Sequence, residues 1–221
     1  MNVAVFGANG RTGRLIVAEL ARRGHAPVAI TRRPVEVAGA AAHRVLDLAD
    51  AAAVREAAGG AAISALASSS GNRACSALAE ALGPSAGLRL VTVAGAAVDA
   101  PGDRKPWPER RFGPLLARLV GEMILDRQRE FAILTLADAR WTMLRPPRLT
   151  NNAATGRAAL SFGRPVSSRI ARADLAAAVV DALLDEGLVR RAPFVAEARR
   201  WSGRPAAATA DNALAPRAGS R

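Results

Sequence analysis

Short apolar runs alternate with longer amphipathic segments along most of the chain. The runs lack polar alternation, which is typical of strands that are buried on both faces of a sheet. The runs expected to form strands are residues 3–6, 27–30, 45–48, 61–66, 88–96, 141–144 and 193–196. The segments between them place apolar residues at helical spacing, as Leu15, Ile16 and Leu20 do after the first run. The pattern predicts a domain of the α/β class.

Several helical segments have recognisable ends. Gly24 stands where a glycine commonly ends a helix, and Asp50 is a suitable N-cap for the helix that follows it. The later helices are expected at residues 51–58, 73–82, 112–125, 126–137 and 176–184. From residue 201 the chain shows no apolar periodicity. We therefore expect one domain over residues 1–200 and a disordered tail over residues 201–221.

A glycine loop leads from the first apolar run into the first helix. Gly7, Gly10 and Gly13 recur at every third position. Between a strand and a helix, such glycines allow a sharp turn, the approach of a pyrophosphate to the backbone and close packing of the helix. The first helical turn favours phosphate through its N–H groups and the helix dipole. The expected dinucleotide-binding residues of this loop are Gly7, Asn9, Gly10, Arg11, Thr12 and Gly13. The alternative is a glycine-rich turn that binds no ligand.

Adjacent arginines follow the second predicted strand, at a position that bears on the choice of cofactor. Folds that prefer NAD tend to carry an acidic residue there, which bonds the ribose 2′-hydroxyl. This chain carries Arg32 and Arg33 instead, and guanidinium groups are suited to a 2′-phosphate. Arg11 adds a further positive charge. The sequence therefore favours NADP(H) over NAD(H), with a solvent-exposed arginine pair as the alternative.

The net charge of +12 raises the question of nucleic-acid binding. Lys105 is the only lysine, and the arginines are spread along the chain rather than concentrated in one segment. We therefore expect a solvated basic surface and no nucleic-acid partner.

No run reaches the roughly 20 apolar residues of a membrane span, and no signal peptide is visible. A single cysteine, Cys75, fits a reducing compartment, so the expected location is the cytoplasm, without a membrane partner.

Few side chains are suited to catalysis. The chain has no tyrosine, so a phenol proton donor is excluded. His25 and His43 are the only histidines, and neither has a partner at metal-ligand spacing. No metal site is expected. The chemistry is expected to belong to a bound cofactor.

Three stretches together resemble one protein family. They are the glycine loop at residues 7–13, the segment Trp-Thr-Met-Leu-Arg-Pro-Pro-Arg-Leu at residues 141–149, and Ala-Asp-Leu-Ala at residues 173–176. The chain resembles the atypical short-chain dehydrogenases/reductases of the NAD(P)H-binding type, which include NmrA-like proteins and the biliverdin-IXβ and flavin reductases. The resemblance covers most of residues 1–196. It implies a single Rossmann-type, doubly wound parallel sheet with helices on both faces and NADPH across the carboxyl edge of the strands.

The resemblance also implies positions around the cofactor. Asp47 and Leu48 would flank the adenine, although Asp47 equally suits a cap at the end of a strand. Asp174 is expected to cap the last helix. The other residues implied beside the cofactor are Ala65, Leu66, Ala94, Gly95, Arg145 and Pro146. Ala94 and Gly95 stand where flavin-reductase-like members carry a hydroxyl group, and this departure puts a direct catalytic role for the protein in question.

The combined interpretation is an NADPH-dependent reductase that passes hydride to a small conjugated acceptor such as a flavin or a quinone. Arg148 is a candidate to hold an acidic acceptor. Arg110 and Arg111, in a proline-rich segment over residues 99–111, are candidates for the same role. That segment is either a lid or an ordinary surface loop.

Two alternatives to the reductase remain open, and the missing tyrosine and hydroxyl sustain the first of them. It is a non-catalytic NADP(H) sensor of the NmrA-like kind. The second, less favoured, is a protein related to nucleotide-sugar epimerases and dehydratases. In each case the expected state is a monomer or a homodimer.

Overall fold

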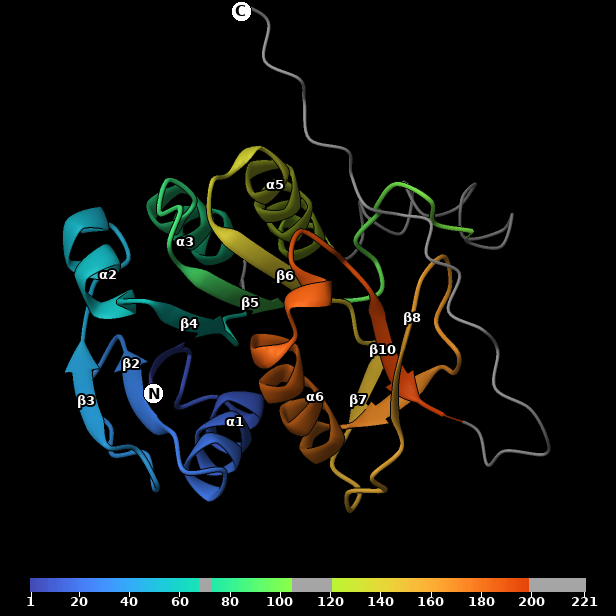
Figure 1. Ribbon diagram of the computed structural model, residues 1–221, viewed down its shortest axis with the longest axis horizontal. Helices are drawn as coiled ribbons and strands as arrows, with labels where there is room; N and C mark the ends of the chain where they lie inside the picture. Colours follow the sequence, from blue (N-terminus) through green and yellow to red (C-terminus); the bar gives the residue numbers. More distant parts are fainter. Residues whose placement is uncertain (68–72, 105–120, 199–221) are drawn as a thin grey trace, which may run out of the picture.

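The computed structural model describes residues 1–67, 73–104 and 121–198. Its centre is a six-stranded parallel sheet with the strand order β3-β2-β1-β4-β5-β6 (Figure 1). The strands are β1 Asn2–Phe6, β2 Ala26–Thr31, β3 Ala42–Val45, β4 Ala61–Ser64, β5 Arg89–Val93 and β6 Arg140–Leu144. The order reverses between β1 and β4, and such a point in a doubly wound sheet is where ligands bind. The Rossmann-type fold expected from the sequence is confirmed.

Helices cover both faces of the sheet. They are α1 Arg11–Arg22, α2 Ala51–Ala58, α3 Ala74–Leu82, α5 Glu122–Leu136 and α6 Arg172–Leu184, with a short 3-10 turn, η1 Glu186–Leu188. In Figure 1, α1 and α6 lie below the sheet and α2, α3 and α5 lie above it.

Successive residues of β1 explain this layering. Val3 and Val5 belong to the core that includes Ile16 of α1 and Val179 of α6. Phe6 belongs to the other core, with residues of α2, α3 and α5. Because neighbouring residues of a strand point to opposite faces, a strand that is apolar throughout supplies both cores at once.

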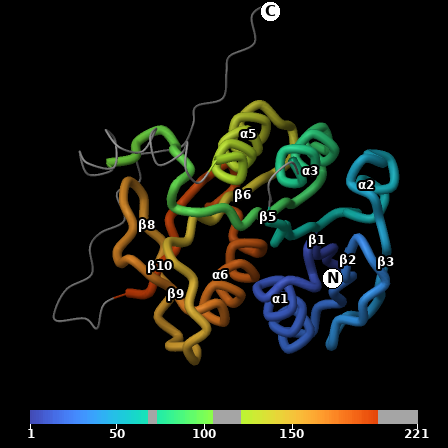
Figure 2. The backbone as a smooth tube through the Cα atoms, turned by 180° about the vertical axis from the view of Figure 1, so that it is seen from behind, coloured from blue at the N-terminus to red at the C-terminus, as the bar shows by residue number. Residues whose placement is uncertain are grey.

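Two small sheets extend the molecule beyond β6. In one, β7 Arg148–Thr150 pairs in parallel with β9 Arg169–Ala171. In the other, β8 Ala158–Ser161 pairs antiparallel with β10 Phe194–Glu197. Figure 2 shows β8, β9 and β10 grouped beside β6 and α6, on the side of the molecule away from β3.

The predicted helix ends are confirmed at two positions. Gly24 has a φ of 77° and its N–H donates to the carbonyl of Ala21, so it ends α1 in the left-handed conformation that glycine adopts easily. The Asp50 carboxylate accepts hydrogen bonds from the N–H groups of Ala52 and Ala53, at 3.1 and 3.0 Å, and caps α2.

The third strand was wrongly placed. The sequence predicted residues 45–48, whereas β3 is Ala42–Val45, paired with Val28–Thr31 of β2. It is an edge strand with all of its residues exposed, so burial leaves no apolar run to mark it. Leu46 and Leu48, which suggested the strand, pack against the core just beyond its end.

Several element boundaries also differ from the prediction. The helix expected at residues 126–137 begins at Glu122, and the last helix begins at Arg172 rather than at residue 176. Phe194–Glu197 does form a strand, but in a small antiparallel sheet outside the central one. Most of the helix expected at residues 112–125, and the tail expected at residues 201–221, lie outside the described residues.

Candidate functional site

A cleft of about 590 Å³ lies at the carboxyl edge of the central strands. It combines the glycine loop and the exits of β4 and β5 with the segment that follows β6. Its lining residues are Gly10, Arg11, Thr12, Ala65, Leu66, Ala67, Val93, Ala94, Gly95, Ala96, Ala97, Val98, Met123, Ile124, Arg127, Pro146, Pro147, Arg148, Leu149 and Arg172. Segments that are far apart in the sequence therefore meet at the point where the strand order reverses.

Close backbone packing forms the glycine-loop side of the cleft. Gly7 has a φ of 76°, and a Cβ atom there would lie 2.9 Å from the carbonyl oxygen of Ala65. A Cβ atom on Gly13 would lie 2.1 Å from the carbonyl oxygen of Gly7. Glycine is therefore required at Gly7 for the turn and at Gly13 for the approach of α1 to the loop. The tight packing that the sequence analysis expected of a glycine loop between a strand and a helix is therefore present.

Positive charge gathers at the N-terminus of α1. Gly10 is the N-cap, and Arg11 and Thr12 of the first turn line the cleft. Arg172, the first residue of α6, lines it as well. Burial, and then the charge of Arg11, lower the pKa of Arg172, so the two guanidinium groups repel each other in the absence of an anion. A helix N-terminus beside two arginines is suited to the phosphates of a dinucleotide.

The opposite wall of the cleft is apolar and is held by the backbone. The N–H of Ala94 donates to the carbonyl of Leu144 at 2.9 Å, and the N–H of Ala96 donates to that of Pro146 at 2.9 Å. These bonds join the exits of β5 and β6 beyond the last strand residues. The residues that they hold, together with Leu149, form a platform of small and apolar groups against which a flat ring can lie.

Arg127 is a further lining residue, and the sequence analysis did not identify it. Its guanidinium donates to Glu130 at 2.6 Å and also to the carbonyl oxygen of Leu66. Burial raises the pKa of the Glu130 carboxyl, an effect that the charge of Arg127 opposes. The pair thus ties α5 to the exit of β4. Charges at helical spacing usually indicate a solvated face, which is why the sequence gave no sign of this buried pair.

A protein carboxylate occupies the N-terminus of α3. Asp126 accepts hydrogen bonds from the backbone N–H groups of Cys75 and Ser76, at 3.0 and 3.1 Å, and from the Ser76 hydroxyl. These N–H groups therefore serve the packing of α5 against α3. Cys75 is buried, as expected for a structural rather than a reactive thiol.

Arg145 has a structural role that the sequence did not predict. Its guanidinium donates to both carboxylate oxygens of Asp103, at 2.6 and 2.9 Å, and to the carbonyls of Val98 and Ala192. It also lies over the ring of Phe194, 3.9 Å from the centroid. The expectation that Arg145 contacts the cofactor does not fit this geometry, because its donors are used within the protein. The neighbouring Pro146 does line the cleft.

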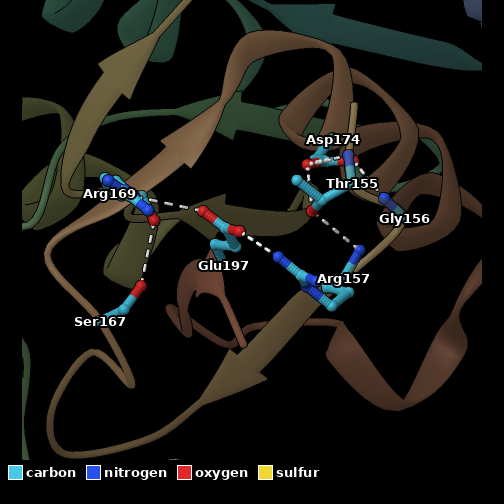
Figure 3. Close-up of polar contacts among 7 residues, drawn as sticks. All are labelled: Thr155, Gly156, Arg157, Ser167, Arg169, Asp174 and Glu197. Carbon is cyan, nitrogen blue, oxygen red and sulfur yellow. Dashed lines mark hydrogen bonds and ion pairs between the residues drawn. The ribbon is translucent and has the colours of Figure 1, made fainter. Parts of the chain in front are cut away.

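Asp174 is structural, but it is not the N-cap of α6. The helix begins at Arg172, so Asp174 lies within its first turn. Its carboxylate accepts from the N–H and hydroxyl of Thr155, at 2.9 and 2.8 Å, and from the N–H of Gly156 at 2.8 Å (Figure 3). Asp174 is almost fully buried and anchors the segment before β8 to α6.

The structure brings together only part of the predicted site. Arg32 and Arg33 are exposed beyond β2 and do not line the cleft. The Asp47 carboxylate accepts from the N–H of Ala49 at 3.0 Å, which is the local capping role that the sequence left open. Asn9 is exposed, and its carbonyl accepts from Arg14. Arg110 and Arg111 lie outside the described residues.

The ionisable groups that line the described cleft are all arginines: Arg11, Arg127, Arg148 and Arg172. Within the described part of the chain, no cluster of three histidine, cysteine, aspartate or glutamate side chains could hold a metal ion. None of the described helices is long and apolar enough to cross a membrane. The cleft can therefore bind anions and flat rings, but its described walls offer no carboxyl or imidazole group for proton transfer.

A second cavity, of about 560 Å³, adjoins the small sheets. Its lining residues are Arg148, Arg157, Val166, Ser167, Ser168, Arg169, Glu197 and Ala198. Arg148 lines both cavities. The sequence indicated Arg148 alone among these residues, because the others come from segments without a motif.

A family model described as NAD(P)H-binding matches residues 7–186 of the chain. A search of curated protein sequences found no match. Among solved structures, a protein of Burkholderia pseudomallei named as exported is 28% identical with a TM-score of 0.69, over 89% of this chain and 99% of that one.

Two further solved structures share the fold at lower identity. ChuY, an anaerobillin reductase from Escherichia coli, is 21% identical with a TM-score of 0.70, over 93% of this chain and 100% of that one. A protein of Streptococcus pneumoniae assigned as an NADH-flavin reductase is 23% identical with a TM-score of 0.67, over 89% and 99% of the two chains. These likenesses show the shared Rossmann fold.

Proposed function

The chain belongs to the NAD(P)H-binding family, and from this premise we propose that it is an NADPH-dependent reductase of a small conjugated acceptor. The proposed acceptors are flavins, quinones or similar conjugated molecules. The observation that carries the proposal is the composition of the cleft, which joins a phosphate-binding helix N-terminus to an apolar platform. Bound NADPH would supply the hydride from C4 of its nicotinamide, which is the chemistry that this chain's own side chains lack.

The residues present fit a dinucleotide. A Cβ atom on Gly7 or Gly13 would clash with the backbone of the loop or of Ala65, so these glycines hold the loop in the tight form that places Gly10, Arg11 and Thr12 in the cleft. In this proposal, Gly10 to Gly13 hold the pyrophosphate, with Arg11 and Arg172 adding charge.

The two ends of the dinucleotide are assigned to different segments. Arg32 and Arg33 bind the 2′-phosphate, and Asp47 and Leu48 flank the adenine. Ala94, Gly95 and Pro146 contact the nicotinamide. The arginine pair lies outside the cleft, at the end of β2, where a 2′-phosphate projects in folds of this type.

The protein contributes position rather than acid or base chemistry. The bonded exits of β5 and β6 keep the platform rigid, so that a flat acceptor is held face to face with the nicotinamide. Because the described lining offers no carboxyl or imidazole donor, the acceptor takes its proton from water.

The fold relatives support this acceptor class without identifying the acceptor. One is named for reduction of anaerobillin and another for reduction of flavin. Both names describe conjugated acceptors that a flat apolar platform suits. We further propose that the partner is a small molecule, that neither nucleic acid nor a membrane is bound, and that the protein acts in the cytoplasm as a monomer or homodimer.

The proposal is tested by following NADPH oxidation at 340 nm with flavin mononucleotide and a panel of quinones. Steady turnover is expected with NADPH. The double variant Arg32→Ala/Arg33→Ala should raise the KM for NADPH by about 10- to 100-fold, since charge-assisted hydrogen bonds are lost. The KM for NADH should change little, because NADH has no 2′-phosphate.

The matched control is the double variant Arg129→Ala/Arg164→Ala. Both residues are exposed arginines outside the cleft, so the same charge is removed without touching the site. An equal rise in the KM for both nucleotides, or a rise in the control, would contradict the proposed 2′-phosphate site.

A sensor function is the second candidate, and the missing hydroxyl at Ala94 and Gly95 favours it. A sensor would bind NADPH tightly and turn over none of the acceptors. The same assay, combined with a binding measurement, separates the two functions.

A further inference from the structure

The second cavity and the cleft beside the glycine loop have one lining residue in common, Arg148. We infer that it binds an anionic group, a carboxylate or a phosphate, on the tail of the acceptor whose ring lies in the cleft. The inference rests on the proposed reductase function and narrows the substrate class to conjugated acceptors with an acidic tail.

The register of the small parallel sheet brings two positive charges together. Arg148 of β7 is the direct partner of Arg169 of β9. Partners in a sheet point to the same face, and both side chains line the second cavity, so two like charges share one wall of it. Among the described residues, no acceptor bonds the side chain of Arg148. An anion between the two arginines would relieve the repulsion.

A third arginine completes the cavity from a different sheet. Arg157, just before β8, donates to Glu197 of β10 at 2.6 Å, and Arg169 approaches the same carboxylate at 3.4 Å (Figure 3). Three arginines and one glutamate leave an excess of positive charge at the cavity. Hydrogen bonding from Arg157 lowers the pKa of Glu197, so the carboxylate is ionised at neutral pH and positions the two guanidinium groups.

The backbone around Arg157 is fixed before any ligand arrives. Its N–H donates to the Thr155 hydroxyl at 3.3 Å, and Asp174 holds that hydroxyl in turn (Figure 3). Its carbonyl accepts from the N–H of Ala198 at 2.7 Å. A guanidinium mounted on a fixed backbone loses less entropy on binding.

One donor of Arg157 remains unused. Its Nε atom is buried and has no hydrogen-bond partner within the described part of the chain. A buried donor without an acceptor is costly to a folded protein, and because Arg157 lines the cavity, a shift of its side chain towards a bound oxyanion would give this donor a partner. A purely structural ion pair with Glu197 would not require this spare donor or the neighbouring Arg148.

The experiment compares flavin mononucleotide with riboflavin, because the two share one ring system and differ by a phosphate. Binding is measured by quenching of flavin fluorescence with NADP+ present, so that the result does not depend on turnover. The wild-type protein is expected to bind flavin mononucleotide more tightly than riboflavin. Arg157→Gln should weaken the binding of flavin mononucleotide by about 10- to 100-fold and leave riboflavin unchanged.

Arg164→Gln is the matched control. Arg164 is an exposed arginine on the same segment as β8 and β9, but it does not line the cavity. Inorganic phosphate should compete with flavin mononucleotide and not with riboflavin. A second pair, anthraquinone-2-carboxylate and 2-(hydroxymethyl)anthraquinone, distinguishes recognition of a carboxylate from recognition of a phosphate.

Equal affinity of the wild-type protein for the charged and neutral members of both pairs would overturn the inference. So would an equal loss for both flavins in Arg157→Gln, since that result would indicate damage to the ring site. Failure of the proposed reductase function gives a different result. NADPH oxidation would then be absent, while flavin mononucleotide would still bind more tightly than riboflavin.

Discussion

The two cavities share Arg148 but are built from different materials. The cleft beside the glycine loop combines backbone and small side chains, such as Gly10 and Ala94, with larger apolar groups and four arginines. The adjoining cavity is lined mainly by polar side chains, namely three arginines, two serines and one glutamate. In the proposed function, backbone N–H groups hold the pyrophosphate with added charge from arginines, whereas arginine side chains hold the acidic tail. The difference suggests that the fold supplies the cofactor site and that the small sheets adapt the chain to its acceptor.

The largest effect is expected from Gly13→Ala, which alters the glycine loop beside the cleft. The added Cβ atom would lie 2.1 Å from the carbonyl oxygen of Gly7, so α1 must move away from the loop. We expect a loss of about 3 kcal/mol in the free energy of unfolding, at the upper end of the usual cost of overpacking. NADPH affinity should fall by more than tenfold, about 1.4 kcal/mol or more.

Chemical denaturation and NADPH titration measure these effects. Gly60→Ala is the control, because nothing lies within 4 Å of a Cβ atom at Gly60. A Gly13→Ala protein with normal stability and normal NADPH affinity would show that the close approach of α1 is not required.

Asp174→Ala should damage the second cavity more than the first. The substitution removes the buried carboxylate that accepts from the N–H groups of Thr155 and Gly156, so we expect a loss of about 2 to 3 kcal/mol in stability. Arg157, which follows directly, would lose its fixed backbone. The affinity for flavin mononucleotide should fall more than the affinity for NADPH, as measured by titration of the folded variant at low temperature. A fall in the affinity for NADPH with no fall in the affinity for flavin mononucleotide would contradict the separation of the two cavities.

An ion pair outside both cavities provides a reference, because its loss should change stability without changing ligand binding. Glu19 accepts hydrogen bonds from Arg22 and Arg23, and these lower its pKa from 4.5 to about 2. Because the folded pKa is lowered, the stabilisation is fully present above pH 4.5 and is lost as the pH falls towards 2. Glu19→Gln should cost about 1 kcal/mol at pH 7, since both arginines keep contact with solvent and the pair is screened.

Thermal unfolding as a function of pH measures this effect. The difference in Tm between Glu19→Gln and the wild-type protein should shrink as the pH falls below 4.5, and ligand affinities should be unaffected at pH 7. A difference that is independent of pH would exclude the ion pair as its cause.

The sequence predicted the central fold because its signals are local. Gly7 marks a turn that few other residues can form, Gly13 marks a close approach of α1, and the apolar runs mark strands buried on both faces. Asp50 caps a helix that begins at the next residue. The exposed edge strand β3 was misplaced because its residues have no core to mark them.

The candidate site was less predictable because its side chains depend on distant partners. Arg145 resembles a cofactor ligand in the sequence, but Asp103 holds it across 42 positions. Asp174 resembles a helix cap, but its partner Thr155 lies 19 positions earlier. In a chain rich in arginine, composition does not distinguish the buried Arg127 from the solvated Arg164.

Direct titration of the protein with NADPH tests the central claim, that the cleft beside the glycine loop is a nucleotide site. The account predicts saturable binding with one nucleotide per chain, weaker binding of NADH, and a marked loss of NADPH affinity in Arg32→Ala/Arg33→Ala. If neither nucleotide binds the folded wild-type protein, the glycine loop is only a turn and the assignment of the cleft is contradicted.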